Sequence, residues 1–210
     1  MIRRAALEVR SGMIVNLGIG LPGHVTRFLG DGLDVCLHSE NGIAGVGPVL
    51  PTDRADRNLI DAGGNYVSTV SGASFFDSAV SFSMIRSGRV DLSVLGALQV
   101  GANGDLANWA IPGRFTPGPG GATELAQKAR RVVALTRHQD KHGRSKLVER
   151  CSLPLTAATC VDRIITDLAV IDVVDGRFVL RELAEDIAVG EILDATDAPL
   201  EMSQAPLSTF

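Results

Sequence analysis

The chain is poor in aromatic side chains and carries no excess of positive charge. Only 4% of its 210 residues are aromatic, with one Trp and one Tyr, so little is available for stacking on nucleic-acid bases. The formal net charge is −4, whereas a surface that binds phosphate backbones needs an excess of Lys and Arg. We therefore expect no nucleic-acid partner.

Cysteine is also scarce, and its three positions are Cys36, Cys151 and Cys160. An odd number of widely spaced thiols fits a reducing compartment better than a disulfide framework. No Cys-x-x-Cys pair suggests a metal site, so we expect no metal. Cys36 is interpreted as a small buried hydrophobe rather than a nucleophile.

Long apolar runs are missing as well. Residues 1–12 alternate charged and apolar side chains, which predicts neither a signal peptide nor a membrane span. We expect a cytoplasmic protein without a membrane partner. Apolar residues make up 45% of the chain and charged residues 21%, close to the globular average. We predict a single domain over residues 1–200 and a C-terminal tail over 201–210, either loose or docked as a strand.

Hydrophobic periodicity alternates between helix and strand. Apolar residues at helical spacing predict three helices, in residues 2–9, 75–85 and 122–129. Short apolar runs predict strands in residues 13–17, 33–37, 90–95 and 132–135, and a late hairpin joins residues 168–173 to 178–181. The pattern predicts an α/β fold, a mostly parallel open sheet with helices on both faces and antiparallel additions at one end.

Glu40 is the candidate catalytic residue. It lies in Ser39-Glu40-Asn41-Gly42, where the strand predicted at residues 33–37 runs into a Gly-rich loop. Ligands of open α/β sheets bind at the carboxyl ends of strands, and glycines let a substrate approach the backbone. A carboxylate there could be a nucleophile, a general base or a metal ligand, and the segment could equally be an ordinary turn.

The run from His38 to Pro48, HSENGIAGVGP, resembles the active-site segment of the β subunit of 3-oxoacid CoA-transferases. Further segments similar to that family are Asn16–Pro22, Gly96–Val100, Gly104–Trp109, Cys151–Thr156 and Val161–Thr166. The ordered series covers residues 3 to 200. The resemblance implies that Glu40 is the covalent nucleophile and that the sheet is CoA-transferase-like.

The resemblance also implies a ping-pong reaction through a Glu40–CoA thioester. Coenzyme A is then a substrate, and no permanently bound cofactor is expected. Acyl-CoA and carboxylic acids are the expected substrates, with succinyl-CoA as donor and acetoacetate or 3-oxoadipate as acceptor, although acetate or butyrate pairings use similar motifs. Two alternatives are an acyl-CoA hydrolase, and a non-catalytic ligand-binding module on the same fold.

Two Gly-rich segments, Gly18–Gly20 and Gly118–Gly121, are candidate sources of oxyanion donors, chiefly the backbone N–H groups of Gly20, Gly120 and Gly121. The family's second segment usually ends Gly-Gly-Ala-Met-Asp. Here Thr123 and Glu124 replace the last two residues, which leaves the backbone donors but puts side-chain contacts from this segment in doubt.

Polar residues near strand ends are candidates for binding substrate or CoA: Asn41, Gly42, Gln99 and Asn103. Asn103, Asp105 and Asn108 could instead hold loops together through Asx turns. We interpret His38 as a packing or solvent-facing residue rather than a general base, and Asp162-Arg163 as an ion pair.

The chain resembles only the half of these enzymes that contains the nucleophile. The resemblance therefore implies an α subunit as partner, in a heterodimer or heterotetramer. An exposed apolar patch should mark the interface with that partner.

Overall fold

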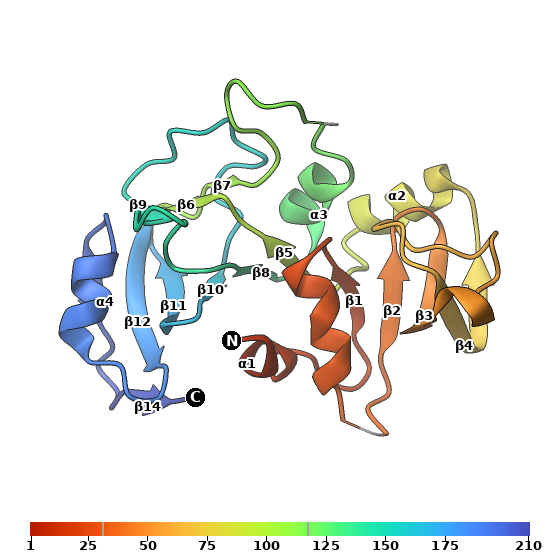
Figure 1. The fold of residues 1–210 in the computed structure, drawn as a ribbon, viewed down its shortest axis with the longest axis horizontal. Helices are drawn as coiled ribbons and strands as arrows, with labels where there is room; N and C mark the ends of the chain where they lie inside the picture. The colour runs from red at the N-terminus through yellow and green to blue at the C-terminus, as the bar shows by residue number, and fades with distance from the viewer. Residues whose placement is uncertain (31, 117) are drawn as a thin grey trace.

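The structure is a computed structural model that describes residues 1–30, 32–116 and 118–210. Within these ranges the chain forms an eleven-stranded mixed sheet in the order β13-β12-β11-β10-β8-β5-β1-β2-β3-β4, with β14 beside β12 (Figure 1). Its strands are β1 (Ile14–Leu17), β2 (Cys36–Ser39), β3 (Ile43–Val49), β4 (Val67–Phe75), β5 (Leu92–Gly96), β8 (Val132–Leu135), β10 (Arg163–Ile165), β11 (Ala169–Val174), β12 (Arg177–Leu183), β13 (Leu200–Met202) and β14 (Ser208–Thr209). A smaller sheet joins β6 (Gln99–Gly101), β7 (Leu106–Ala107) and β9 (Leu147–Val148).

The centre of the large sheet is parallel. Strands β2, β1, β5, β8 and β10 are joined by parallel pairings, as in an α/β fold. At one end β11 and β12 form the predicted antiparallel hairpin. The prediction that such additions occur at one end was wrong, because β3 pairs antiparallel with β2 at the other end, and β4 pairs antiparallel with β3. Register shifts interrupt the β3–β4 pairing, so the sequence lacks the regular alternation that would have indicated it.

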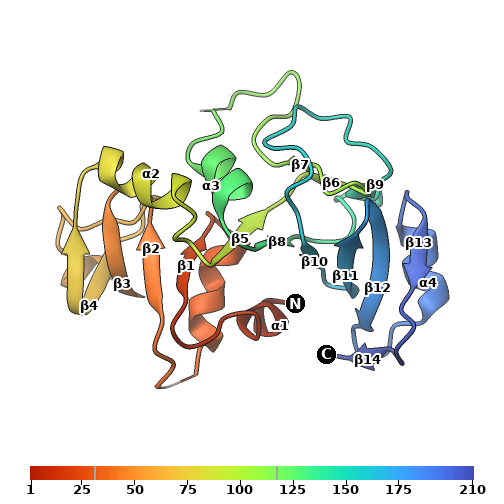
Figure 2. The same ribbon diagram turned by 180° about the vertical axis from the view of Figure 1, so that it is seen from behind.

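Helices cover both faces of the sheet, as predicted. On one face α1 (Ile2–Ala6) and the 3₁₀ helix η1 (Leu21–Phe28) pack on the sheet, with Ala5, Val9 and Val25 in one apolar cluster. On the opposite face lie α2 (Ser78–Arg86) and α3 (Ala122–Lys128), which join through Ile85 and Leu125 (Figure 2). The remaining helices are α4 (Val189–Ala195) and the short η2 (Thr52–Arg54).

Two predicted boundaries shift by a few residues. The strand expected at residues 33–37 is β2, which begins at Cys36 because its partner strand begins at Ile14. Ser39, which pairs with Ile43 of β3, is the last residue of β2, and Glu40 directly follows it. The helix expected from residue 75 begins at Ser78, since the Asp77 carboxylate accepts a hydrogen bond from Val80 N and caps the helix.

The last ten residues contain β14, which runs parallel to β12 through Ser208 and Thr209. Phe210 packs against the same cluster as α1, and the two termini lie near each other in both views (Figures 1 and 2). In the described parts of the chain, every helix is too short or too polar to cross a bilayer.

Candidate functional site

Glu40 lies at the carboxyl end of β2, in a turn that only glycine can complete. Gly42 N donates to Ser39 O, and Gly42 has a φ of 117°. A Cβ atom at residue 42 would lie 1.9 Å from the carbonyl oxygen of Phe76. Gly42 therefore fixes the turn that presents the half-buried Glu40 side chain.

Asn16 holds the Glu40 carboxylate. Its Nδ2 lies 3.0 Å from Glu40 Oε2 and donates to it, and it also donates to the backbone oxygen of His38 over 3.1 Å. Asn16 is fully buried and stands opposite His38 on the neighbouring strand. In the sequence, Asn16 stands out only as part of a segment similar to the family. The available signal was an amide side chain in β1, but its role can be recognised only once β1 is known to pair with β2.

Gly121 forms the other side of the site. It precedes α3, and a Cβ atom there would lie 2.9 Å from Glu40 Cγ and 3.3 Å from Oε1. Gly120, with a φ of 55°, turns the chain just before it. Gly20 instead lies at the start of η1, and Gly18 packs against Val94 O of β5. Of the predicted glycines, Gly121 is therefore the one that the structure places against Glu40.

His38 is buried and hydrogen-bonded rather than exposed to solvent. Its Nε2 lies 3.0 Å from Ser81 Oγ of α2, and its ring stacks on Phe76. Burial lowers the pKa of His38 from its ordinary value, although the nearby Glu40 acts in the opposite direction. The ring is thus kept neutral beneath the carboxylate.

The other polar candidates hold loops. Asn41 Nδ2 donates to Ile60 O, Gln99 Oε1 accepts from the backbone N–H groups of Ser152 and Leu153, and Asn103 Oδ1 accepts from Asp105 N.

Asp105 and Asn108 are tied in the same way. Asp105 Oδ1 accepts from Thr159 N, and Asn108 donates to Gly96 O and accepts from the Thr156 hydroxyl. Asp105 and Asn108 thus make the contacts expected of residues that hold loops together, which was the alternative to binding substrate or CoA.

The predicted Asp162–Arg163 ion pair was wrong. Asp162 lies just before β10 and Arg163 is the first residue of that strand, and the two side chains take different partners. Asp162 Oδ2 accepts from Val132 N over 2.7 Å. Arg163 instead pairs with Asp172 over 2.6 Å and with Glu8 over 2.7 Å.

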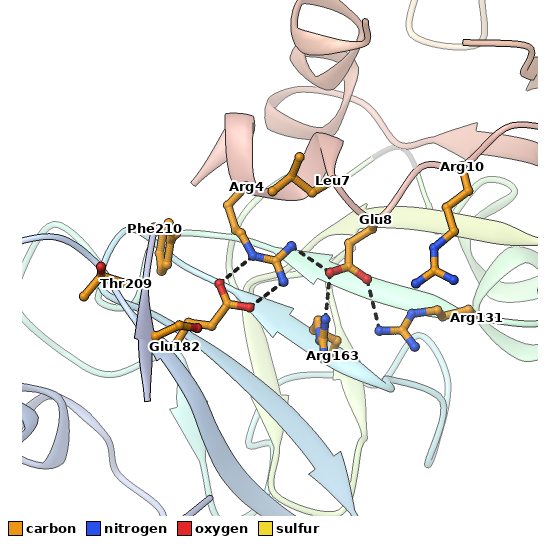
Figure 3. A pocket seen from close by; sticks show the side chains of 10 residues that line it. Arg4, Leu7, Glu8, Arg10, Arg131, Arg163, Glu182, Thr209 and Phe210 are labelled. Carbon is orange, nitrogen blue, oxygen red and sulfur yellow. Dashed lines mark hydrogen bonds and ion pairs between the residues drawn. The ribbon is translucent and has the colours of Figure 1, made fainter. Parts of the chain in front are cut away.

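A pocket of about 470 Å³ lies elsewhere, between α1 and β14 (Figure 3). It borders the amino ends of β8 and β10, whereas Glu40 follows the carboxyl end of the parallel strand β2. Most of its charged side chains pair with one another: Arg4 pairs with Glu182 and Glu8, and Glu8 also pairs with Arg131 and Arg163. We interpret it as a structural ion-pair cluster. No His, Cys, Asp and Glu side chains in the described ranges are grouped so as to hold a metal.

Several large apolar side chains are exposed at the surface. Ile19 is 72% exposed and Phe115 is 96% exposed. Ile60, whose backbone oxygen accepts from Asn41, and Phe75, which pairs with Ile43, are exposed as well. Where such side chains gather into one patch, they are typical of a surface that another protein covers.

The comparisons with known proteins agree with this geometry. The family model for coenzyme A transferase matches residues 1–195. One subunit of the probable succinyl-CoA:3-ketoacid coenzyme A transferase of Bacillus subtilis is 47% identical over 100% of this chain and 97% of that protein. One subunit of the 3-oxoadipate CoA-transferase of Pseudomonas putida is 45% identical over 95% of this chain and 94% of that protein.

Among solved structures, an acyl-CoA transferase of Escherichia coli O157:H7, crystallised as a thioester complex with CoA, superposes with a TM-score of 0.77 at 21% identity. The match covers 100% of this chain and 42% of that one, and it supports the fold. The sequence matches extend over almost the whole chain, so this protein belongs to the coenzyme A transferase family.

Proposed function

We propose that this chain is the β subunit of a 3-oxoacid CoA-transferase and that Glu40 is its nucleophile. The observation that carries the proposal is the arrangement of the carboxylate. Glu40 Oε2 accepts from Asn16 Nδ2, while Oε1 receives no hydrogen bond from any described residue. One oxygen is thus held in place and the other is left for attack on a thioester.

The reaction is the one that the resemblance to 3-oxoacid CoA-transferases implies. Glu40 attacks the acyl-CoA carbonyl, the C–S bond breaks, and a mixed anhydride and CoA thiolate result. The thiolate then attacks the glutamyl carbonyl of the anhydride, which releases the donor carboxylate and leaves a Glu40–CoA thioester. An acceptor carboxylate reverses the two steps, so the mechanism is ping-pong.

Each tetrahedral intermediate carries an oxyanion that needs hydrogen-bond donors. The Asn16 amide is one such donor, since it already contacts Glu40. The closeness of Gly121 to Glu40 supports the backbone N–H groups of Gly120 and Gly121 as others. Asn41, Gln99 and Asn103 act on CoA indirectly in this scheme, by shaping the loops that surround the site.

The relatives support the substrate class and the partner. Both sequence relatives described above are named as single subunits of their enzymes, and the names include succinyl-CoA, 3-ketoacid and 3-oxoadipate. We infer succinyl-CoA as the donor, acetoacetate or 3-oxoadipate as the acceptor, and an α subunit that covers exposed apolar side chains. Residues 1–200 are proposed to be one domain and 201–210 its tail. The three unpaired thiols support a cytoplasmic location.

The test is covalent trapping. The chain, co-expressed with its α subunit, is incubated with acetoacetyl-CoA and borohydride, which reduces a glutamyl thioester and changes the mass of the residue. Peptide mass spectrometry should locate the change at Glu40. Glu40→Ala should abolish the change, whereas Glu149→Gln, at an exposed position, should leave it intact. An unmodified Glu40 in an intact complex would refute the assignment.

Acceptor dependence separates the transferase from the hydrolase. Without an acceptor, a transferase releases at most one donor carboxylate per Glu40, and turnover continues only when a second carboxylate takes up CoA. Steady release of CoA without an acceptor would favour the hydrolase instead.

A further inference from the structure

A row of four buried polar side chains lies beneath Glu40. Ser93, Asn16 and His38 stand opposite one another on the adjacent parallel strands β5, β1 and β2, and Ser81 of α2 extends the row beyond His38. Their exposed fractions are 0%, 0%, 3% and 0%, in that order. Burying polar groups costs free energy unless they are hydrogen-bonded, so the contacts in this row decide its role.

The neighbours of Asn16 fix the orientation of its carboxamide. Nδ2 lies 3.0 Å from Glu40 Oε2 and 3.1 Å from His38 O, two groups that only accept hydrogen bonds. If the carboxamide were turned over, Oδ1 would face both acceptors and could not hydrogen-bond to either, so the orientation with Nδ2 facing them is the favoured one. Nδ2 also lies 3.4 Å from His38 Nδ1, so this ring nitrogen must face Asn16 without a proton.

The tautomer of His38 follows from this orientation. A neutral ring with a bare Nδ1 carries its proton on Nε2, which lies 3.0 Å from Ser81 Oγ and donates to it. The lowered pKa of His38, caused by its burial, agrees with a neutral ring. Ser81, His38, Asn16 and Glu40 thus form one consistent series of donors and acceptors.

The carboxamide is anchored on one side only. Asn16 Oδ1 and Ser93 Oγ are both buried, and neither has a hydrogen-bond partner in the described part of the chain. Ser93 stands on the side of Asn16 opposite His38, where its hydroxyl could accept from a carboxamide that had turned over. The orientation that serves Glu40 therefore depends on the contacts with His38 and Glu40.

We propose that His38 and Ser81 are positioning residues of the transferase, which act on Glu40 through the Asn16 carboxamide. Ser81 holds the ring so that its bare Nδ1 faces Asn16, and Asn16 then directs its N–H groups at Glu40. The inference rests on the proposed role of Glu40 as nucleophile. It extends that role to two residues whose side chains reach the carboxylate only through Asn16.

The test measures thioester formation in the complex with the co-expressed α subunit. Ser81→Ala should slow single-turnover formation of the Glu40–CoA thioester on the order of 10-fold, because the carboxylate is less well placed. The KM for acetoacetyl-CoA should stay unchanged, since neither residue is proposed to bind CoA. Ser83→Ala is the matched control, because Ser83 lies on the same helix but is exposed and bonded to Ala79 O.

A double-mutant cycle tests whether the effect passes through Asn16. In an Asn16→Ala background, Ser81→Ala should cause no further loss of rate. Equal slowing in both backgrounds, or a rise in KM without loss of rate, would overturn the proposal. A wild-type complex that forms no thioester would instead refute the proposed function itself, and the positioning role with it.

His38 provides a second pair of variants in case Ser81→Ala folds poorly. His38→Leu removes the hydrogen-bonding groups of the ring and should slow thioester formation. His38→Gln retains a donor and an acceptor, so it should stay closer to the wild-type rate. Equal rates for the two variants would contradict the proposal.

Discussion

Gly121→Ala should displace the nucleophile without disturbing the fold. The new methyl group would lie 2.9 Å from Glu40 Cγ. Ordinary carbon–carbon contacts are about 3.5 Å or longer, so the Glu40 side chain must move by roughly 0.6 Å. The backbone at residue 121 has φ −75° and ψ −6°, which alanine adopts freely, so the cost in folding free energy should stay below about 1 kcal/mol.

A displacement of this size should slow the chemical step. Misplacing a reacting group by about 1 Å can cost about 100-fold, so thioester formation at Glu40 should slow roughly 10- to 100-fold. The assay is single-turnover thioester formation, followed by mass spectrometry, beside a melting curve. Gly190→Ala is the matched control, because Gly190 lies in α4 with open space around it. Wild-type rates in Gly121→Ala would refute the contact between Gly121 and Glu40.

Three further predictions concern stability and reactivity. Burial lowers the pKa of His138 to about 4, although Asp167 opposes the shift. The unfolded chain therefore binds this proton at a higher pH than the folded chain does. As pH falls from about 6.5 to about 4, the free energy of unfolding should drop by about 3 kcal/mol in urea titrations, and His138→Gln should flatten that slope. Gly42→Ala should cost about 3 kcal/mol or more, seen as a lowered Tm, because its Cβ would collide with Phe76 O. Burial raises the pKa of Cys151 to about 11 and of Cys160 to about 12, so both thiols should react slowly with iodoacetamide at pH 8 until urea unfolds the chain. A flat pH profile, an unchanged Tm or rapid alkylation would contradict the respective prediction.

Local sequence was sufficient to predict the turn at Ser39–Gly42, whereas the role of Glu40 as nucleophile came from the resemblance of the whole segment to a family. The acidic residue and Gly42 lie within a single short segment, and the loop conformation follows from glycine chemistry. Four strands of the parallel centre, β1, β2, β5 and β8, were equally accessible as short apolar runs, whereas the three-residue β10 was not predicted. The antiparallel pair β3–β4 was missed because its register shifts interrupt the period of two on which strand prediction relies.

Of the two residues that contact Glu40, Gly121 was a candidate from its Gly-rich segment, whereas the contact with Asn16 could not be found in the same way. Asn16 precedes Glu40 by 24 residues and meets it only because β1 pairs with β2 in parallel. Gly121 meets it because α3 begins beside the carboxyl end of the sheet. The local sequence around Asn16 or Gly121 does not show how far either residue lies from Glu40. The strand pairing and register must be known before these contacts can be identified.

Parallel pairing also explains why a strand residue serves as the support of a loop nucleophile. Asn16 of β1 stands opposite His38 of β2, and His38 precedes Glu40 by two residues. The turn after β2 therefore brings the Glu40 carboxylate back to Asn16. A support on a strand is held by the sheet, whereas one on a loop would move with the substrate. The rigid side of the site is thus supplied by β1. The reaction also needs CoA to enter and water to be excluded. We expect these two functions at the surface where Ile19 and Phe115 are exposed and where the α subunit is proposed to dock.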